Sequence, residues 1–334
     1  MKEIKKNKLA VGIIGLGVGL HHFKAFDNNP KTYVKYVCDL DNRKLDQFKN
    51  KNLRIKITNN SEEIFKDKDI KIVSIASFDE CHFDQIMKSI KNNKHIMVEK
   101  PLCLEKYQLK KINAAMSKKN LILSSNMVLR TNPRFNFIKK SISKSIKSIY
   151  YIEAEYLWGR PEKLQGWRKK TKNYSLILGA SIHMIDLVLF LIKKKPIYVK
   201  AIGNKLDIGK SIINSETFIG LDLIFNNGLI VRINTHATCK FPHFHNLRIF
   251  SNNYTIISDI NGCFKTGKNN KFNVINKEYP FKSNRHLIID SFISKIFKKY
   301  DDYFVSFKEI NILMSVCFSA IESLKKNKSI KIRY

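Results

Sequence analysis

The sequence predicts an α/β protein with an N-terminal doubly wound parallel sheet and a second, C-terminal domain that contains a mostly antiparallel sheet. Over the first 123 residues, short apolar runs alternate with polar stretches of helical length, as is typical of a parallel sheet covered by helices. From about residue 150 the chain instead has longer segments in which apolar and polar residues alternate. Such alternation is typical of an antiparallel sheet with one covered face.

The expected elements of the first domain follow one another without interruption. A helix over 61–67 begins with Ser61 and has Glu63 in its first turn, which is a helix start signal. The bounds of the other strands and helices follow from the periodicity of their apolar residues. Strands are expected over 9–16, 33–39, 54–58, 70–77, 95–100 and 121–127, and helices over 19–28, 43–51, 61–67, 83–93 and 104–118.

In the second domain, one strongly apolar helix over 178–193 interrupts the strands, and two helices over 287–299 and 307–325 close the chain. No Pro-rich linker marks the boundary, which falls between residues 126 and 150. We expect domains over 1–125 and 126–334, with closing helices able to pack back on the first domain. Strands are expected over 149–158, 197–206, 217–225, 228–238, 246–252 and 254–260.

The composition of the 334-residue chain is that of a globular protein, with 44% hydrophobic residues and a formal net charge of +33. A charge of this size could indicate nucleic-acid binding, but only ten of the 61 basic residues are Arg, and the lysines are spread along the whole chain. We therefore expect no nucleic-acid partner. The electrostatic field of so large a positive charge should still attract small anions. The six cysteines form no C-x-x-C pair and are expected to be reduced thiols.

The apolar run over 9–20 follows a basic stretch and could resemble a signal peptide or a membrane segment. It has 12 residues, fewer than the roughly 18 that span a bilayer, and no small-x-small cleavage site follows it. No later apolar stretch reaches membrane length either. We expect a cytoplasmic protein without a membrane partner.

The same run reads best as a strand that enters a glycine turn. Gly15 and Gly17 would permit the tight turn, and the backbone from Gly15 through Leu16 and Gly17 to Val18 would approach a pyrophosphate at a helix N-terminus. The third glycine is one residue early in comparison with G-x-G-x-x-G, so the motif alone is weak.

Asp39 ends the second strand, where an acidic side chain can accept hydrogen bonds from the ribose hydroxyls of a dinucleotide. A carboxylate there would repel a 2′-phosphate, which favours NAD over NADP. Arg43 lies close by and could accommodate that phosphate, so NADP stays open. An ordinary surface acid in a βα turn is the alternative interpretation.

Glu99, Lys100 and Pro101 follow a predicted strand at the carboxyl edge of the sheet, where ligands bind in open α/β sheets. A lysine there can exchange a proton with a substrate hydroxyl if burial lowers its pKa. The alternative is a solvated lysine in a chain that is rich in them.

Together these motifs resemble those of the glucose-fructose oxidoreductase and inositol dehydrogenase family, Gfo/Idh/MocA. The resemblance rests on the pattern G-x-G-x-G-x-x-H, on Asp39, on "SFDECH", on Glu-Lys-Pro, and on "NMVLRTNPRF", "GWR" and "GASIHMIDL". It implies a Rossmann domain followed by an α/β domain with a large open sheet. It also implies action on sugars, inositols or nucleotide sugars with a nicotinamide cofactor.

The resemblance also implies roles for residues of the first domain. Lys100 matches the active-site lysine, and Glu99 matches a neighbour that approaches the nicotinamide ribose. Ser77 and His82 match the cofactor-proximal loop after the fourth strand, where many members have Thr-Pro-Asn instead of Ser-Phe-Asp.

In the second domain, Trp167 and Arg168 match a pair near the nicotinamide end, and His183 matches the histidine of a D-x-x-x-H element. The aspartate position of that element is Gly179 here, which leaves His183 with Lys100 as the proton-handling pair. Asp186 stands one turn from His183 and could orient its ring or cap a local loop.

Further polar side chains could bind the substrate. Arginines can fork onto a carboxylate or a diphosphate, and surface salt bridges are the alternative for each of them. His243 and His245 share a strand face; without a third ligand we expect no metal, and a place near the sugar pocket or a subunit contact. The candidate substrate residues are Arg130, Tyr156, Arg160, Asp186 and His245, with Arg134, Lys163 and Arg285 as weaker ones.

The sequence therefore predicts an NAD-dependent dehydrogenase that acts on a ring hydroxyl of a sugar or nucleotide sugar, for instance in surface polysaccharide or amino-sugar biosynthesis. The alternative is a non-catalytic sugar sensor that keeps the cofactor fold. Because the long strands must hide one face, we also expect a homodimer or homotetramer built through residues 198–257. The sugar, the ring carbon and the direction of the reaction do not follow from the sequence.

Overall fold

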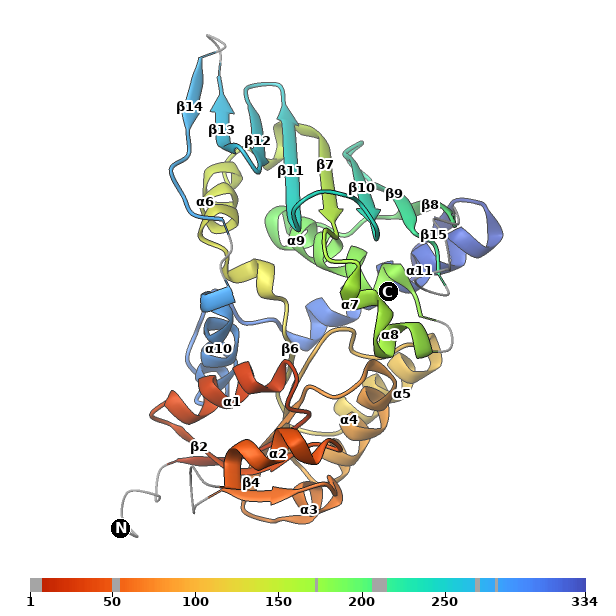
Figure 1. Ribbon diagram of the computed structural model, residues 1–334. Coiled ribbons are helices and arrows are strands. Elements are labelled where there is room, and N and C mark those ends of the chain that lie inside the picture. The colour runs from red at the N-terminus through yellow and green to blue at the C-terminus, as the bar shows by residue number, and fades with distance from the viewer. Residues whose placement is uncertain (1–7, 50–54, 172–173, 206–214, 268–270, 280–281) are drawn as a thin grey trace. The chain divides into compact units, whose positions relative to one another are not determined.

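The computed structural model describes residues 8–49, 55–171, 174–205, 215–267, 271–279 and 282–334. The chain divides into two compact units, which Figure 1 shows as ribbons. Unit 1 comprises Met1–Val128 and Lys282–Ile310, and unit 2 comprises Leu129–Phe281 and Asn311–Tyr334. The ends of three expected elements, at residues 50–51, 54 and 206, lie outside the described residues.

Unit 1 is built on a parallel sheet, as the sequence predicts. Over the described residues this sheet has six strands in the order β3-β2-β1-β4-β5-β6, and every neighbouring pair is parallel. The order reverses direction between β1 and β4, which is the switch point where doubly wound sheets bind ligands. The strands are β1 (Leu9–Ile14), β2 (Thr32–Cys38), β3 (Lys56–Thr58), β4 (Ile70–Ile75), β5 (His95–Val98) and β6 (Leu123–Ser125).

Helices connect these strands, and one further helix returns to unit 1 from the far end of the chain. Figure 1 shows α10 beside α1, where Phe26 meets Phe292 edge to face at 6.5 Å and Asn29 donates to Asp290 at 2.7 Å. The helices are α1 (Gly19–Asn28), α2 (Asn42–Lys49), α3 (Glu62–Lys66), α4 (His82–Lys91), α5 (Lys106–Met116) and α10 (His286–Ile296), with 3-10 turns η2 (Asp79–Cys81) and η6 (Lys282–Arg285).

Unit 2 holds a larger sheet whose pairs are antiparallel except for β7 and β10. In the described residues it has nine strands in the order β14-β13-β12-β11-β7-β10-β9-β8-β15. This confirms the expected mostly antiparallel sheet. The strands are β7 (Ile149–Leu157), β8 (Tyr198–Asn204), β9 (Phe218–Ile224), β10 (Ile230–His236), β11 (Phe244–Ser251), β12 (Thr255–Asp259), β13 (Gly262–Thr266), β14 (Phe272–Val274) and β15 (Ile330–Lys331).

One face of this sheet is covered by helices. Figure 1 shows α6 and α9 against it, and the Ser323 hydroxyl of α11 accepts a hydrogen bond from the Ala201 amide of β8 at 2.9 Å. The predicted helix over 178–193 begins as a π-helical turn, η5 (Ile177–Ser181), and continues as α9 (Ile182–Ile192). The other helical segments are η3 (Val128–Thr131), α6 (Pro133–Ile142), η4 (Ile146–Ser148), α7 (Glu162–Gln165), α8 (Trp167–Lys170) and α11 (Phe307–Lys326), the last of which crosses from unit 1 into unit 2.

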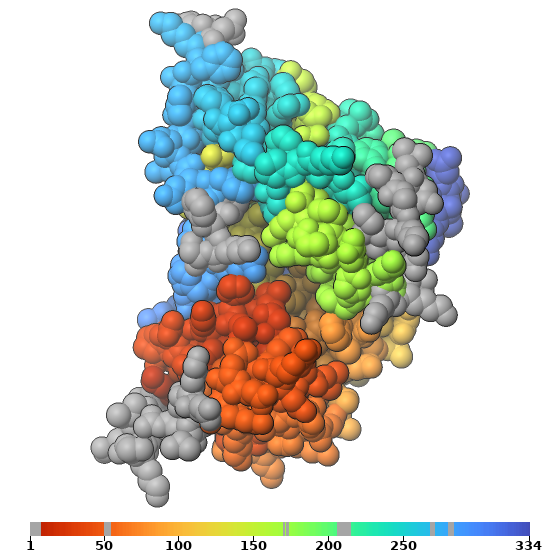
Figure 2. Space-filling model, viewed as in Figure 1, coloured from red at the N-terminus to blue at the C-terminus, as the bar shows by residue number. Residues whose placement is uncertain are grey.

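The opposite face of the sheet carries two parallel rows of side chains. The strand register places Tyr198, Ile224, Ile230, Tyr151 and Phe250 side by side in one row. Ile230 is 44% exposed and Tyr198 is 37% exposed. Atoms of β11 and β12, coloured cyan, lie at the visible surface in Figure 2.

The second row on this face is charged. It consists of Lys200, Asp222, Arg232, Glu153 and Arg248. Arg232 pairs with Asp222 at 2.8 Å, and Arg248 pairs with Glu153 at 3.0 Å. An apolar row beside an alternating charged row is suited to contact with another protein surface.

A buried ion pair fastens the start of unit 2 to its central helix. Arg130 of η3 donates from Nε and Nη2 to the carboxylate of Asp186 on α9, over 2.7–3.2 Å. The two residues are 3% and 1% exposed, and the guanidinium also lies over the Phe190 ring. Each charge thus compensates the other inside the core, which is a structural role that the sequence analysis did not foresee.

None of the helices formed by the described residues is long and apolar enough to cross a membrane.

Candidate functional site

The glycine turn after β1 is fixed by backbone contacts on both sides. Gly15 has φ +88°, and a Cβ there would collide with the carbonyl of Ala76. Both the backbone conformation and the lack of space therefore require glycine at this position. Its amide donates to the carbonyl of Cys38 at 2.8 Å. Gly17 differs, since a Cβ there would meet nothing within 4 Å. The turn is therefore tight at Gly15 and open at Gly17.

Gly19 is the first residue of α1 and has the structural role that the third glycine of the motif usually has. A Cβ on Gly19 would lie 3.2 Å from the Ala76 Cβ, so the bare glycine lets the helix pack close to the end of β4. The shift of one residue from G-x-G-x-x-G is thus compatible with the packing that the motif serves.

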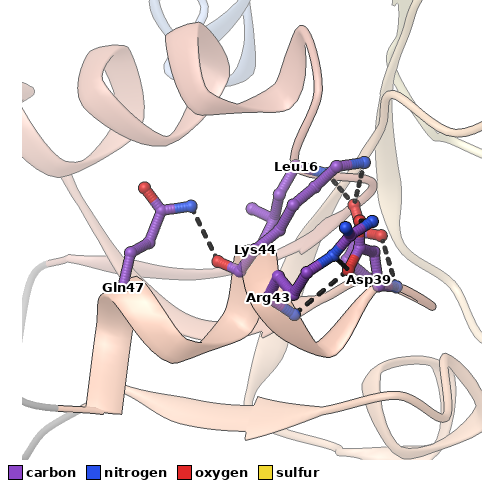
Figure 3. Close-up of polar contacts among 6 residues, drawn as sticks. Leu16, Asp39, Arg43, Lys44 and Gln47 are labelled. Atoms are coloured by element: carbon purple, nitrogen blue, oxygen red, sulfur yellow. Dashed lines mark hydrogen bonds and ion pairs between the residues drawn. The ribbon is translucent and has the colours of Figure 1, made fainter.

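Asp39 holds the turn from the side of β2, as Figure 3 shows. Its Oδ2 accepts a hydrogen bond from the Leu16 amide at 2.6 Å, and its Oδ1 accepts one from the Asp41 amide at 2.9 Å. Lys44 Nζ lies 3.4 Å from Oδ2. The side chain is 9% exposed, so Asp39 is a buried anchor of the turn as well as a candidate ribose ligand.

Arg43 points its guanidinium to Asp41 rather than to Asp39. Both contacts are 3.0 Å long, and the Arg43 side chain is 90% exposed. This pairing lowers the pKa of the Asp41 carboxyl below its ordinary value. The nearest cation to Asp39 is thus Lys44, although Arg43 was the residue that the sequence analysis singled out.

The loop after β4 is tied to the segment that carries Lys100. His82 is fully buried, with Nδ1 2.7 Å from the Pro101 carbonyl and Nε2 3.3 Å from the Ser77 carbonyl. The Ser77 hydroxyl donates to Gln85 at 2.7 Å. In this arrangement both ring nitrogens of His82 face the protein backbone, so His82 positions the loop.

Glu99 lies at the centre of a polar network that joins α1, β4, β5 and the end of β6. Its Oε1 lies 3.0 Å from His22 Nε2 and accepts a hydrogen bond from Asn126 Nδ2 at 2.7 Å. Nδ1 of His22 lies 2.7 Å from the Ser74 hydroxyl. A ring that is protonated on Nε2 can donate to Glu99 and accept from Ser74 at the same time.

The network keeps Glu99 ionised. Although burial raises the pKa of this carboxyl, its interactions with His22, Asn126 and Lys100 lower it to about 2. Among the described residues, Oε1 takes both side-chain hydrogen bonds and none is made to Oε2. The site therefore presents a fixed anion with one oxygen available, directly before Lys100.

The candidate residues of unit 2 gather around Tyr156. The Tyr156 ring stacks on His183 of α9, with ring centroids 5.9 Å apart. On β11, His245 is the residue paired with Tyr156 of β7, and the centroids of these two rings lie 4.7 Å apart. His243 lies 5.2 Å from Tyr156 and 5.1 Å from His245. The structure thus brings together His183, Tyr156 and His245, which the sequence analysis had singled out separately.

Gly179 has a steric explanation. A Cβ at this position would collide with the hydroxyl of Tyr174, so the space beside the π-helical turn is filled by a tyrosine. No side chain of any kind fits at 179 while Tyr174 keeps its place. Tyr174 therefore stands next to the position from which a family member would present an aspartate.

Four further predicted residues of unit 2 lie on α7, α8 and the loop before them, which are yellow-green at the visible surface in Figure 2: Arg160, Lys163, Trp167 and Arg168. Arg134 lies on α6. Arg168 stacks over Trp167 at 4.4 Å and over Trp158 at 5.6 Å, and it donates to the Lys163 carbonyl at 3.0 Å. Trp167 and Arg168 belong to unit 2, whereas the glycine turn and Lys100 belong to unit 1.

Sequence reasoning assigned no role to four residues of these clusters: His22, Ser74, Asn126 and Tyr279. Asn126 follows β6 at the carboxyl edge of the sheet, so the rule that selected Glu99 would also have found it. His22 is the histidine of the pattern G-x-G-x-G-x-x-H, although the pattern gave it no role, and Ser74 and Tyr279 are recognisable only from their contacts. In the part of the chain that the structure describes, no group of three His, Cys, Asp or Glu side chains could hold a metal ion.

Unit 1 also has a groove of about 510 Å³ between α1 and α10. Its lining includes His21, Lys24, Asn29, Arg285 and Asp290. None of the residues assigned to catalysis or cofactor binding lines it, so it does not extend the candidate site.

Comparison with known proteins gives matches over both units. The model of the Gfo/Idh/MocA oxidoreductase family with an NAD-binding Rossmann fold matches residues 9–127, and the model of the family's C-terminal domain matches residues 142–257.

Among curated proteins, 1,5-anhydro-D-fructose reductase of Ensifer adhaerens is 25% identical over 54% of this chain and 54% of its own length. UDP-N-acetylglucosamine 3-dehydrogenase of Acidithiobacillus ferrooxidans is 21% identical over 54% of this chain and 53% of its own length. The chain thus spans about half the length of the curated relatives it matches. A solved structure of levoglucosan dehydrogenase in complex with NADH and levoglucosan has a TM-score of 0.84 at 17% identity and covers 98% of this chain and 99% of its own.

The network around Glu99 gives a prediction about stability. His22→Leu leaves the buried carboxylate without one of its two donors, so we expect the unfolding free energy to fall by about 1–3 kcal/mol. His22→Gln carries an amide that can still donate and should lose less. Thermal melts of both variants beside wild type measure the difference, and equal losses would show that the hydrogen bond to Glu99 is unimportant.

Proposed function

The chain belongs to the Gfo/Idh/MocA family of NAD-binding oxidoreductases, and on that premise we propose that it is a dehydrogenase for a ring hydroxyl of a sugar or nucleotide sugar. The observation that carries the proposal is the arrangement at the end of β5. There an ionised, hydrogen-bonded Glu99 precedes Lys100 on the edge of the sheet that also bears the glycine turn. Relatives named as sugar and nucleotide-sugar enzymes support the substrate class.

The residues of unit 1 fit a dinucleotide. The open space at Gly17 leaves room for a pyrophosphate against the backbone of residues 15–18, and α1 begins directly behind it. In this proposal Asp39 would hold the adenosine ribose, and Glu99, whose Oε2 is available, would hold the nicotinamide ribose. Ser77 belongs to the same cofactor-proximal loop. The cofactor supplies the hydride chemistry when it is bound.

The chain's own groups handle the proton. We assign that role to Lys100 and His183, since an amine and an imidazole can both exchange a proton with an alcohol. Lys100 carries positive charge beside Glu99, which lowers the pKa of that carboxyl. His183 is held by its stack on Tyr156, which fixes the plane of the ring. Trp167 and Arg168 complete the proposed nicotinamide end.

The cofactor preference follows from the charges around β2. Asp39 opposes a 2′-phosphate, while Lys44 at 3.4 Å weakens that opposition and Arg43 is occupied by Asp41. We propose NAD as the preferred cofactor, because Asp39 stands at the end of β2, where an acidic residue meets the adenosine ribose in dinucleotide-binding folds.

We also propose a homo-oligomer, built through the open face of the nine-stranded sheet. The row that contains Tyr198, Ile230 and Tyr151 offers the apolar contact, and the charged row beside it can fix the register. In a monomer, the exposed apolar side chains of this row would favour aggregation.

Lys100→Met tests the chemistry. A methionine keeps the volume of the stem but cannot transfer a proton, so turnover with NAD should fall by about 100-fold or more. The affinity for NAD, measured by calorimetry, should stay within a few fold. A variant with near wild-type kcat would show that Lys100 is not catalytic, and absence of turnover by the wild type over a panel of sugars, inositols and nucleotide sugars would favour a sensor.

Asp39→Ala tests the cofactor assignment. Wild type should bind NAD more tightly than NADP, and the alanine variant should lose that preference because the negative charge is gone. Asp39→Asn is the matched control, since its amide oxygen can still accept the hydrogen bond from the Leu16 amide. Equal or reversed affinities of the wild type for the two cofactors would refute the assignment.

Light scattering at micromolar concentration tests the oligomer. We expect a mass of at least twice 39.0 kDa, since an interface of the proposed kind exceeds roughly 2,000 Å². Ile230→Lys places a charge in the apolar row and should lower the mass while the affinity for NAD is unchanged. A wild-type particle of 39.0 kDa would contradict the proposal.

A further inference from the structure

Arg160 differs from the other arginines of unit 2 in what surrounds its guanidinium. Arg130 has the carboxylate of Asp186, Arg232 has Asp222, and Arg248 has Glu153. Arg134 instead donates to backbone carbonyls, among them those of Lys277 at 3.2 Å and Asp259 at 3.0 Å. The Nε of Arg160 is buried, yet within the described ranges of the chain no hydrogen-bond acceptor reaches it.

The backbone holds Arg160 in this place firmly. A Cβ on Gly159 would collide with the carbonyl of Phe241 and approach the amide of His243, so the chain before Arg160 lies directly against that segment. The carbonyl of Arg160 accepts hydrogen bonds from Trp158 Nε1 at 2.9 Å and from the Lys163 amide at 3.1 Å. Arg160 is therefore fixed beside His243 by packing and by two hydrogen bonds.

The groups next to Arg160 are donors or cations. His245 and Tyr279 are joined by a contact of 2.5 Å between Nδ1 and the phenol oxygen. Burial lowers the pKa of His245 well below 6.5, and His243 and Arg160 lower it further, so the ring is neutral. Burial likewise raises the pKa of Tyr279, which stays protonated.

With both groups neutral, the phenol can donate to Nδ1 of His245, and the ring proton then sits on Nε2 as a further donor. No carboxylate is among the groups that shift the pKa of either residue in the described part of unit 2. A buried guanidinium nitrogen without an acceptor is costly unless a ligand supplies one. Since His245 of the cluster contacts Tyr156, whose ring stacks on His183, such a ligand would lie near the proposed proton-handling histidine.

We propose that Arg160, together with His243, His245 and Tyr279, forms a subsite for an anionic group on the substrate, a carboxylate or a phosphate attached to the sugar. This inference rests on the proposed dehydrogenase function and narrows its substrate class to acidic sugars. A guanidinium suits both anions, because its planar fork matches two oxygens of either group. The subsite anchors the sugar through a group remote from the reacting hydroxyl.

Matched substrate pairs test the subsite. NADH production is measured for glucose against glucuronate, for glucose against glucose 6-phosphate, and for N-acetylglucosamine against its UDP derivative. The wild type should prefer the anionic member of at least one pair, and the preferred pair identifies carboxylate, phosphate monoester or diphosphate. Arg160→Gln should raise the KM for that member by about tenfold or more, since it removes a charge-assisted hydrogen bond.

Three controls distinguish loss of the subsite from other causes of a raised KM. Arg333→Gln removes the same charge from an exposed position and should leave the preference unchanged, which excludes an effect of the net charge. Arg160→Lys should restore part of the preference. The KM for the neutral member and the affinity for NAD should stay within about twofold in Arg160→Gln, because the subsite faces the substrate's acidic group alone.

The outcomes distinguish this inference from the proposed function. Equal use of neutral and anionic members by the wild type would overturn the subsite and leave the dehydrogenase standing. A loss of NAD affinity in Arg160→Gln without a change in preference would also overturn it, because Arg160 would then serve the cofactor. If no sugar is turned over, calorimetry with glucuronate, glucose 6-phosphate and UDP decides: binding that Arg160→Gln abolishes supports the subsite, and no binding of any of them refutes it.

Discussion

The geometry of unit 1 depends on how little room there is at Gly15. The residue lies between the ends of β2 and β4, donates its amide to Cys38, and would collide with Ala76 if it carried a side chain. Its φ of +88° turns the chain sharply away from the sheet. Because the turn is closed here, the next residues must pass over the carboxyl edge. That passage brings the Leu16 amide to Asp39 and starts α1 at Gly19.

The conformation at Gly15 also affects the surroundings of Glu99, because it sets where α1 begins. A helix that begins at Gly19 places His22 in its first turn, buried and facing Ser74 and Glu99. The ionised state of Glu99 and the position of its available oxygen therefore depend on the glycine turn through the path of the backbone. The glycine turn and the network around Glu99 are thus linked through the backbone of α1 within unit 1, so substitutions at Gly15 should disturb both.

Much of the fold could be predicted because the signals are local. Alternating apolar runs gave the strands of unit 1, and α1 over Gly19–Asn28 coincides with the predicted helix. Apart from α6, the elements that were not predicted are short or depend on distant contacts. Asn132 caps α6 with its side chain and Pro133 follows, a start signal that was overlooked, whereas β14 (Phe272–Val274) is three residues long and needs β13 to exist. The sequence analysis allowed for closing helices that pack back on the first domain, and α10 does so by packing on α1 in unit 1, although no local pattern encodes which helix makes this contact.

The arginines show why a site is harder to predict than a fold. Arg130 and Arg160 are equally plausible anion ligands in the sequence, but Arg130 meets Asp186 some 56 positions away and is neutralised in the core, while Arg160 meets no carboxylate among the described residues.

The same reasoning applies at Gly179. From sequence, its glycine looks like the loss of a functional carboxylate. In the structure the hydroxyl of Tyr174 occupies the space where a side chain would begin, so a return to aspartate would need Tyr174 to move. The two positions are therefore coupled. The ring of His183 therefore lies near two tyrosines, since Tyr156 stacks on it and Tyr174 fills the space beside Gly179, four residues earlier in the chain.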